Sequence, residues 1–248
     1  VSGELGVKTK CHLKIDTGMA RYGFMPSEVE SAIKCYTLPN LEFTGAYTHF
    51  SSAFRNSELT KAQKVMFTDT MAQIKNAVGE VGVLHCANSP ALLNVEDVCL
   101  DAVRIGSAFT GRVITKSKLG LNRIGTLEAE VVDVKTVPAG YSIGYNGTYT
   151  TKRETKIAIV PIGHYDGFGI TKEKEQYDLR YILSIVKRYL NKKRMYVRIN
   201  GEMHFVIGSI GLSHTAVDVT GTDIKAGDTA SVDISPLMVN PRIERVYR

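Results

Sequence analysis

Short apolar runs alternate with segments of helical periodicity in the first part of the chain. Strands that alternate with helices are typical of a parallel sheet with helical crossovers. We therefore predict four β/α units before about residue 112. Their strands are expected at residues 11–16, 41–49, 83–87 and 101–104.

The clearest helical segment spans residues 58–78. Apolar residues recur there at helical spacing while lysines occupy other positions, which predicts an amphipathic helix. Ser57 precedes the segment and is the expected N-cap. The positions assigned to the buried face are Leu59, Ala62, Met66, Ile74 and Ala77.

After residue 121 the pattern changes to β-rich runs separated by turn residues, which predicts a separate β domain. Asn200-Gly201, between two alternating runs, is a strong signal for a type I′ hairpin. The strands are expected at residues 127–137, 157–162, 195–199, 204–210, 216–219 and 229–234.

One helix is expected to interrupt this β domain, at residues 172–190. Glutamates at its start and lysines and arginines at its end match the helix dipole. We interpret its apolar stripe as core packing, and assign the helix no functional role. The stripe is Leu179, Leu183, Val186 and Leu190.

The number of β/α units is small for the fold that it suggests. A closed (β/α)8 barrel needs eight units and about 250 residues, whereas four units here take about 110. The predicted fold class is α/β plus β, with the C-terminal half of a TIM-type (β/α)8 barrel at residues 1–122. A mostly β domain follows at residues 123–248, with its inserted helix at about 172–193. Because half a barrel leaves open sheet edges, we expect the chain to be part of a longer protein.

Composition narrows the possible partners. The chain is 44% hydrophobic and 23% charged, which is ordinary for a globular protein, and its formal charge of +6 is spread along the sequence. No basic face with interleaved aromatic residues and no apolar run long enough for a bilayer is found, so neither nucleic acid nor membrane contact is expected. Widely spaced cysteines without a secretory segment suggest buried thiols in a cytoplasmic protein. They are Cys11, Cys35, Cys86 and Cys99.

Charged and small polar residues stand where the predicted strands end. Because α/β enzymes keep their chemistry at the carboxyl ends of strands, we expect a site there for a small ligand that carries a phosphate. Glycine beside a small hydroxyl suits close approach of the backbone to an anion. The residues are Lys14, Asp16 and Arg21 after the first strand, Asn88 and Ser89 after the third, and Arg104, Gly106 and Ser107 after the fourth.

Six segments in order along the chain resemble motifs of the alanine racemase family. These enzymes use pyridoxal 5′-phosphate to invert the α-carbon of a small amino acid. The segments are KIDTGMARYG at 14–23, YTHF at 47–50, HCANS at 85–89, VRIG at 103–106, IGYNGTY at 143–149 and VPIGHYDG at 160–167.

The resemblance implies roles for single residues. Arg104 would face the pyridine nitrogen of the cofactor, with His49 holding the guanidinium, and Ser89, Asn88, Gly106 and Ser107 would complete the cofactor site. Tyr145 would be one of two catalytic bases and would reach from the β domain of one subunit of a homodimer into the barrel of the other. Arg21 would bind the substrate carboxylate, oriented by Lys14, which is carbamylated in many relatives. Leu212 stands where relatives have the methionine of the substrate cavity.

Each assignment has a simpler alternative. His49 could be a satisfied histidine at a strand end, and Tyr145, between Gly144 and Asn146, could be an ordinary turn tyrosine. Lys14 could form a salt bridge to Asp16 or Glu42, and Asn88-Ser89 taken alone is most often a turn. The functional interpretation is preferred because the family-like segments recur in order.

Two departures from the family bear on activity. The chain contains no segment similar to K-A-N-A-Y-G, where relatives carry the lysine that anchors the cofactor and serves as the second base, so the chain alone is expected to be inactive. Residues 208–213 lack the methionine and aspartate of the substrate cavity. L-alanine, converted to D-alanine for cell-wall precursors, is the expected substrate of the intact protein. The alternatives are a serine racemase domain of the glycopeptide-resistance type and a non-catalytic fragment that only binds or assembles.

Overall fold

The structure is a computed structural model that describes residues 1–115, 119–170, 182–183, 186 and 195–247. The chain divides into two compact units, Val1–Arg123 and Ile124–Arg248, and each is described by itself. Among the described residues, no helix has both the length and the hydrophobicity that crossing a membrane requires.

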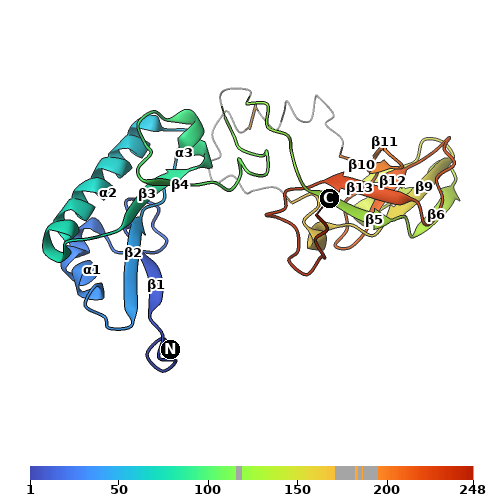
Figure 1. Cartoon of the computed structure of the whole chain (residues 1–248). Coiled ribbons are helices and arrows are strands. Elements are labelled where there is room, and N and C mark those ends of the chain that lie inside the picture. Colours follow the sequence, from blue (N-terminus) through green and yellow to red (C-terminus); the bar gives the residue numbers. More distant parts are fainter. Residues whose placement is uncertain (116–118, 171–181, 184–185, 187–194, 248) are drawn as a thin grey trace. The chain divides into compact units, whose positions relative to one another are not determined.

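The first unit is built on a parallel sheet of four strands in the order β1-β2-β3-β4 (Figure 1). All three neighbouring pairs are parallel, as the alternation of strands and helices predicts. The four predicted strands are thus confirmed, with ends shifted by a few residues. Their bounds are β1 Thr9–Lys14, β2 Leu41–Tyr47, β3 Val83–Asn88 and β4 Ala102–Arg104.

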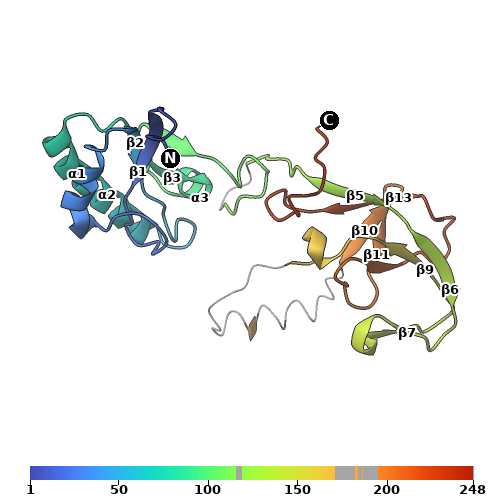
Figure 2. The same cartoon turned by 90° about the horizontal axis from the view of Figure 1, so that it is seen from below.

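Helices cover one face of this sheet (Figures 1 and 2). Buried side chains of β1 and β2, among them Leu13 and Ala46, form one core with Phe67, Met71 and Ile74 of the long helix. The helical elements are η1 Pro26–Glu28, α1 Val29–Cys35, α2 Ser57–Val78 and α3 Ser89–Asn94.

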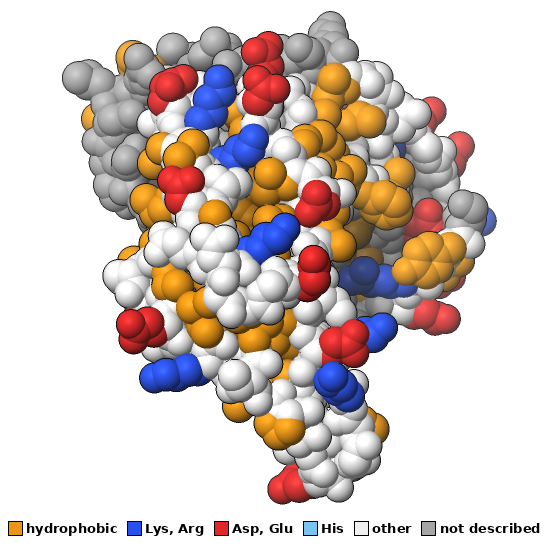
Figure 3. Space-filling view, turned by 60° about the vertical axis from the view of Figure 1, so that its left-hand side comes forward, with side chains coloured by type: hydrophobic (Ala, Val, Ile, Leu, Met, Phe, Trp, Pro, Cys, Tyr) orange, Lys and Arg blue, Asp and Glu red, His pale blue; other side chains and the backbone are white. Residues whose placement is uncertain are grey.

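The N-cap of α2 is Asn56 and not Ser57 as predicted, because the Asn56 side chain accepts a hydrogen bond from the Leu59 backbone N–H. Of the five positions predicted for the buried face, Ile74 is buried as predicted, but the other four are exposed. Figure 3 shows apolar side chains interspersed with charged ones on one face of the molecule. The buried positions are Thr60, Gln63, Phe67, Thr70, Met71 and Ile74.

The prediction placed only apolar residues on the buried face of α2, whereas three of the buried residues are polar. Thr60 and Thr70 donate their hydroxyl protons to backbone carbonyls one turn earlier, and the Gln63 amide bonds to Thr17 and Ser51. Because these polar groups are satisfied inside the unit, burying them carries little penalty.

The second unit consists of antiparallel sheets. Four strands run in the order β11-β10-β13-β5, three in the order β12-β9-β6, and β7 pairs with β8. The run predicted at residues 127–137 is two strands, because the chain leaves β13 after β5 and pairs with β9 as β6. The bounds are β5 Thr126–Glu130, β6 Asp133–Val137, β7 Ser142–Ile143, η2 Tyr145–Gly147, β8 Tyr149–Thr150, β9 Thr155–Val160, η3 His164–Asp166, β10 Tyr196–Ile199, β11 Glu202–Phe205, β12 Thr215–Asp218 and β13 Thr229–Asp233.

The predicted hairpin at Asn200-Gly201 is confirmed. Ile199 pairs with Glu202, and the two turn residues have φ values of 51° and 88°, the positive values that a type I′ turn requires. Most of the helix predicted at 172–190 lies outside the described residues. Of its stripe, Leu183 and Val186 are described and exposed, so the interpretation as core packing is wrong for these two.

The cysteines differ in environment. All four thiols are free, but only Cys86 is buried, whereas Cys11 and Cys35 are partly buried and Cys99 is exposed. The interpretation of all four as buried thiols is therefore wrong for Cys99. Cys99 lies between Val98 and Leu100, whose side chains pack into the core, and its own thiol faces solvent.

Candidate active site

The sheet face opposite the helices of the first unit carries polar and aromatic side chains. Successive side chains of a strand point to opposite faces. In β1, Leu13 belongs to the helix-covered core, so its neighbours His12 and Lys14 lie on the other face. Tyr47 of β2 and His85 of β3 lie there too, stacked with ring centroids 5.3 Å apart. This alternation was a signal in the sequence that could have identified Tyr47 and His85.

Arg104, the last residue of β4, contacts β3 and the residues that directly follow β2. Its Nη1 donates to Nδ1 of His85 at 2.7 Å and to the His85 carbonyl at 3.1 Å. Its Nη2 lies 2.8 Å from the Thr48 carbonyl and 3.3 Å from both the Cys86 carbonyl and Nδ1 of His49. The predicted contact of Arg104 with His49 is present. His85, for which the sequence predicted no role, makes the shorter contact.

These contacts leave one donor of Arg104 available. Guanidinium has five N–H groups and no acceptor, and the four on Nη1 and Nη2 face protein acceptors. Within the described part of the chain no acceptor lies at hydrogen-bonding distance from Nε. The guanidinium also lies over the Tyr47 ring, 5.0 Å from its centroid. Arg104 is therefore fixed in place with Nε–H directed away from its protein partners.

The two histidines beside Arg104 are neutral at pH 7. Burial, and then the charges of Arg104 and His12, lower the pKa of His85 to about 4. Burial and the positive charges of Arg104, Arg21 and Lys14 lower the pKa of His49 as well. A neutral imidazole has one acceptor nitrogen, so both rings can accept a hydrogen bond from the guanidinium.

Asp16 organises the loop after β1. Its Oδ1 accepts the backbone N–H groups of Gly18, Met19 and Ala20, and its Oδ2 accepts that of Arg21. Burial raises the pKa of this carboxyl, but the four hydrogen bonds outweigh burial and lower the pKa to about 2. The carboxylate therefore fixes the backbone from which the exposed Arg21 side chain extends.

Lys14 is not held by a salt bridge. Its ammonium donates to the Tyr22 carbonyl, and within the described residues it forms no ion pair with Asp16 or Glu42. Burial lowers its pKa, opposed by Asp16 and reinforced by Arg21 and Arg104. The salt-bridge alternative is thus wrong, and the amine stays close to two arginines.

Ser89 joins the end of β3 to the loop after β4. Its buried Oγ accepts the backbone N–H groups of Gly106 at 3.0 Å and of Ala108 at 3.2 Å. A hydroxyl has two acceptor sites and one proton, so its proton remains for another acceptor. This loop also contains Ser107, whose carbonyl accepts the Arg112 N–H.

The amide of Asn88 is used within the protein. Its Oδ1 caps α3 by accepting the Ala91 N–H at 3.0 Å, and its Nδ2 donates to the Phe50 carbonyl at 3.5 Å.

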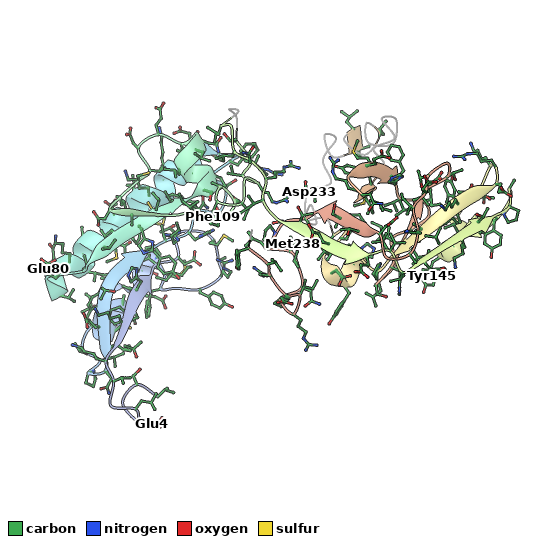
Figure 4. The ribbon with its side chains drawn as sticks, turned by 45° about the vertical axis from the view of Figure 1, so that its right-hand side comes forward. Glu4, Glu80, Phe109, Tyr145, Asp233 and Met238 are labelled. Atoms are coloured by element: carbon green, nitrogen blue, oxygen red, sulfur yellow. The ribbon has the colours of Figure 1, made fainter. Side chains whose placement is uncertain are left out.

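Tyr145 and Leu212 belong to the second unit. Tyr145 begins η2 after the β7 strand (Figure 4) and is 78% exposed, and Leu212 is 69% exposed.

Each of the two units matches a known protein family model. Residues 1–113 match the family described as "Alanine racemase, N-terminal domain", and residues 124–238 match "Alanine racemase, C-terminal domain". The chain belongs to the alanine racemase family. Its members are racemases and in general depend on pyridoxal 5′-phosphate.

Curated relatives and solved structures agree with this membership. The chain is 31% identical to the alanine racemase of Methanococcus maripaludis, matching 94% of the chain and 59% of the relative. It is 33% identical to that of Carboxydothermus hydrogenoformans, at 88% and 56%. The chain thus spans little more than half the length of these alanine racemases.

The fold also matches that of solved alanine racemases. The structure of alanine racemase from Clostridium difficile 630 superimposes with a TM-score of 0.71 and 29% identity over 93% of this chain and 57% of that one. That from Streptomyces lavendulae, a producer of D-cycloserine, gives the same TM-score and identity over 93% and 58%. These neighbours support the alanine racemase fold, a barrel with a β domain.

Proposed function

We propose that the intact protein racemises a small amino acid with pyridoxal 5′-phosphate, and that it converts L-alanine to D-alanine for cell-wall precursors. The observation that carries this proposal is Arg104. Two neutral histidines and three backbone carbonyls hold its guanidinium, and Nε–H is left for a ligand.

The donors of the first unit fit the cofactor. Arg104 would hold the pyridine nitrogen, while the Ser89 hydroxyl and the loop with Gly106 and Ser107 would hold the phosphate. When bound, the cofactor supplies an electron sink for the charge that develops at the α-carbon. Because arginine does not give up its proton, Arg104 would keep the pyridine nitrogen unprotonated and so limit this sink. Asn88 would support the site by capping α3, since its amide already has partners.

Substrate binding would fall to the loop that Asp16 organises. Arg21 would bind the substrate carboxylate, with Lys14 setting the local charge. Tyr145 would move the proton at the α-carbon, acting across a homodimer from the second unit of the partner. Its exposure of 78% supports this role, because a tyrosine packed within its own unit could not reach a site elsewhere.

We further propose that the chain corresponds to the C-terminal part of such an enzyme. Four parallel strands are half of what a closed barrel needs, and the curated relatives are considerably longer than the stretch that matches. The remaining β/α units would supply the lysine that anchors the cofactor. Four free thiols fit a cytoplasmic setting.

The test is the activity of the intact protein. Production of D-amino acid from L-alanine and from L-serine is measured with a D-amino acid oxidase assay, and kcat/KM is compared. A higher value for alanine supports the proposal, whereas no racemisation of either substrate would overturn it. A higher value for serine would favour the serine racemase alternative, which the departures from the family at residues 208–213 leave open.

A further inference from the structure

The hydrogen bonds of Arg104 continue beyond His85 to a second histidine. Nε2 of His85 lies 2.7 Å from Nδ1 of His12, and the two rings meet edge to face with centroids 4.9 Å apart. His12 is in β1 and His85 in β3, so the contact bridges the intervening strand β2. Arg104, His85 and His12 therefore form one continuous series.

A glycine in β2 makes this bridge possible. Gly45 is the register partner of His12. A Cβ atom at Gly45 would lie 2.7 Å from Cε1 and 3.0 Å from Nδ1 of His12, closer than side chains tolerate. The His12 ring thus occupies the space that a side chain at Gly45 would fill.

The number of protons on each side chain determines which atom donates and which accepts in each hydrogen bond of the series. Arg104 can only donate, so Nδ1 of His85 must accept. The single proton of neutral His85 is then on Nε2 and is donated to Nδ1 of His12. His12 in turn carries its own proton on Nε2. No other neutral arrangement satisfies both 2.7 Å contacts.

We propose that His12 is a positioning residue of the cofactor site, whose Nδ1 fixes the His85 ring and through it the Arg104 guanidinium. The role at the cofactor rests on the function proposed above. The hydrogen-bond series itself is formed by residues of this chain and does not depend on that function.

Stacking alone does not give this positioning. The Tyr47 ring lies parallel to His85 within 9° and beneath Arg104, which fixes the plane of the imidazole but not which of its two orientations, related by a half-turn about Cβ–Cγ, the ring adopts. The bond to His12 requires the orientation that directs Nε2 toward Nδ1 of His12. The same hydrogen bond gives the Nε2–H of His85 an acceptor. The His85 side chain is only 8% exposed, and a buried N–H without an acceptor is costly.

The direction of the series can be tested on the unaltered chain by NMR with ¹⁵N-labelled histidine. We expect the His85 proton on Nε2, an unprotonated Nδ1 on His12, and a scalar coupling between these two nitrogens through the hydrogen bond. A proton on Nδ1 of His12, or no coupling between the two nitrogens, would overturn the proposal.

Two variants test the positioning role. His12→Asn keeps an acceptor at the distance of Nδ1 from the backbone, and His12→Phe keeps the ring without an acceptor. We expect solvent exchange of the His85 Nε2 proton to accelerate about tenfold in H12F, as loss of a buried hydrogen bond implies. H12N should stay within about twofold of the parent. His214→Phe, in the second unit, is the matched control and should leave this exchange unchanged.

Titration of the intact protein, with and without the same substitutions, with pyridoxal 5′-phosphate separates the two proposals. We expect H12F to bind the cofactor about tenfold more weakly, and H12N to restore the affinity. Equal affinity of H12F and the parent would overturn the positioning role. If the parent binds no cofactor while the coupling between His85 and His12 is present, the proposed function fails and the hydrogen-bond series stands.

Discussion

At the scale of the residue, the site is built from groups whose hydrogen-bonding capacity is almost fully used. Arg104 keeps one N–H for a ligand, and Ser89 keeps one O–H. The sequence predicted both residues from their places after β3 and β4. It could not predict His85 as the main partner of Arg104, because an isolated histidine in an apolar strand carries no signal of what it faces across the sheet.

Replacing Ser89 with alanine should loosen the loop after β4. The backbone N–H groups of Gly106 and Ala108 would lose their shared acceptor, at a cost of about 1–3 kcal/mol. Amide hydrogen exchange at these two residues should accelerate by the factor that this energy implies, about 5- to 150-fold. Ser107→Ala is the matched control, since only the backbone of Ser107 is engaged toward Arg112. Equal protection in S89A and the parent would contradict the role of Ser89.

Asp16 should make the first unit sensitive to acid. Its folded-state pKa of about 2 is below the ordinary aspartate value of about 3.9. The carboxylate therefore stabilises the fold above pH 4, and this contribution is lost as pH falls through 2. Asp16→Asn turns an amide NH₂ toward a backbone N–H, so the variant should be less stable at pH 7. Urea unfolding from pH 7 to pH 2 should show the difference from the parent shrinking, and a constant difference would contradict the assignment.

At the scale of the element, periodicity predicted the strands of the first unit and the length of α2. It did not predict which face of α2 is buried. The pattern assigns apolar residues to the core, whereas Gln63, Thr60 and Thr70 are buried through bonds to the backbone and to Ser51. The bonds of Gln63 depend on the loops after β1 and β2, which no local pattern specifies.

Gln63 should therefore contribute more to stability than Leu59 and Met66, which were assigned to the core but are exposed. Its Nε2 donates to the Thr17 carbonyl and its Oε1 accepts from the Ser51 N–H. Gln63→Leu leaves both backbone groups unpaired and should cost about 1–3 kcal/mol in the free energy of unfolding. Met66→Gln, on the exposed side of the same helix, should cost less than about 0.5 kcal/mol. Urea unfolding followed by circular dichroism measures both, and equal losses would contradict the orientation of the helix.

At the scale of the whole molecule, the change of pattern near residue 121 predicted a β domain, and the structure divides next to that point, at Arg123 and Ile124. The exchange of strands between sheets in the second unit was not predictable. The run at 127–137 hides the point where β5 ends and β6 joins another sheet, because apolar and charged residues alternate in both strands and no turn residue separates them. The proposed action of Tyr145 at the site of Arg104 likewise depends on assembly.

Mixing two inactive variants of the intact protein tests that assembly. Tyr145→Phe removes the proposed base and Arg104→Ala the proposed cofactor contact, so each homodimer should have lost nearly all racemase activity. If Tyr145 acts on the partner's barrel, a mixed dimer has one site with both residues and one with neither. An equimolar mixture, refolded together, should then recover about a quarter of the parental activity, since half of the dimers are mixed and half of their sites are complete. If Tyr145 acts within its own subunit, every site in the mixture lacks one residue and activity stays at the level of the single variants. Mixing Tyr145→Phe with more Tyr145→Phe, under the same refolding, controls for recovery caused by refolding itself.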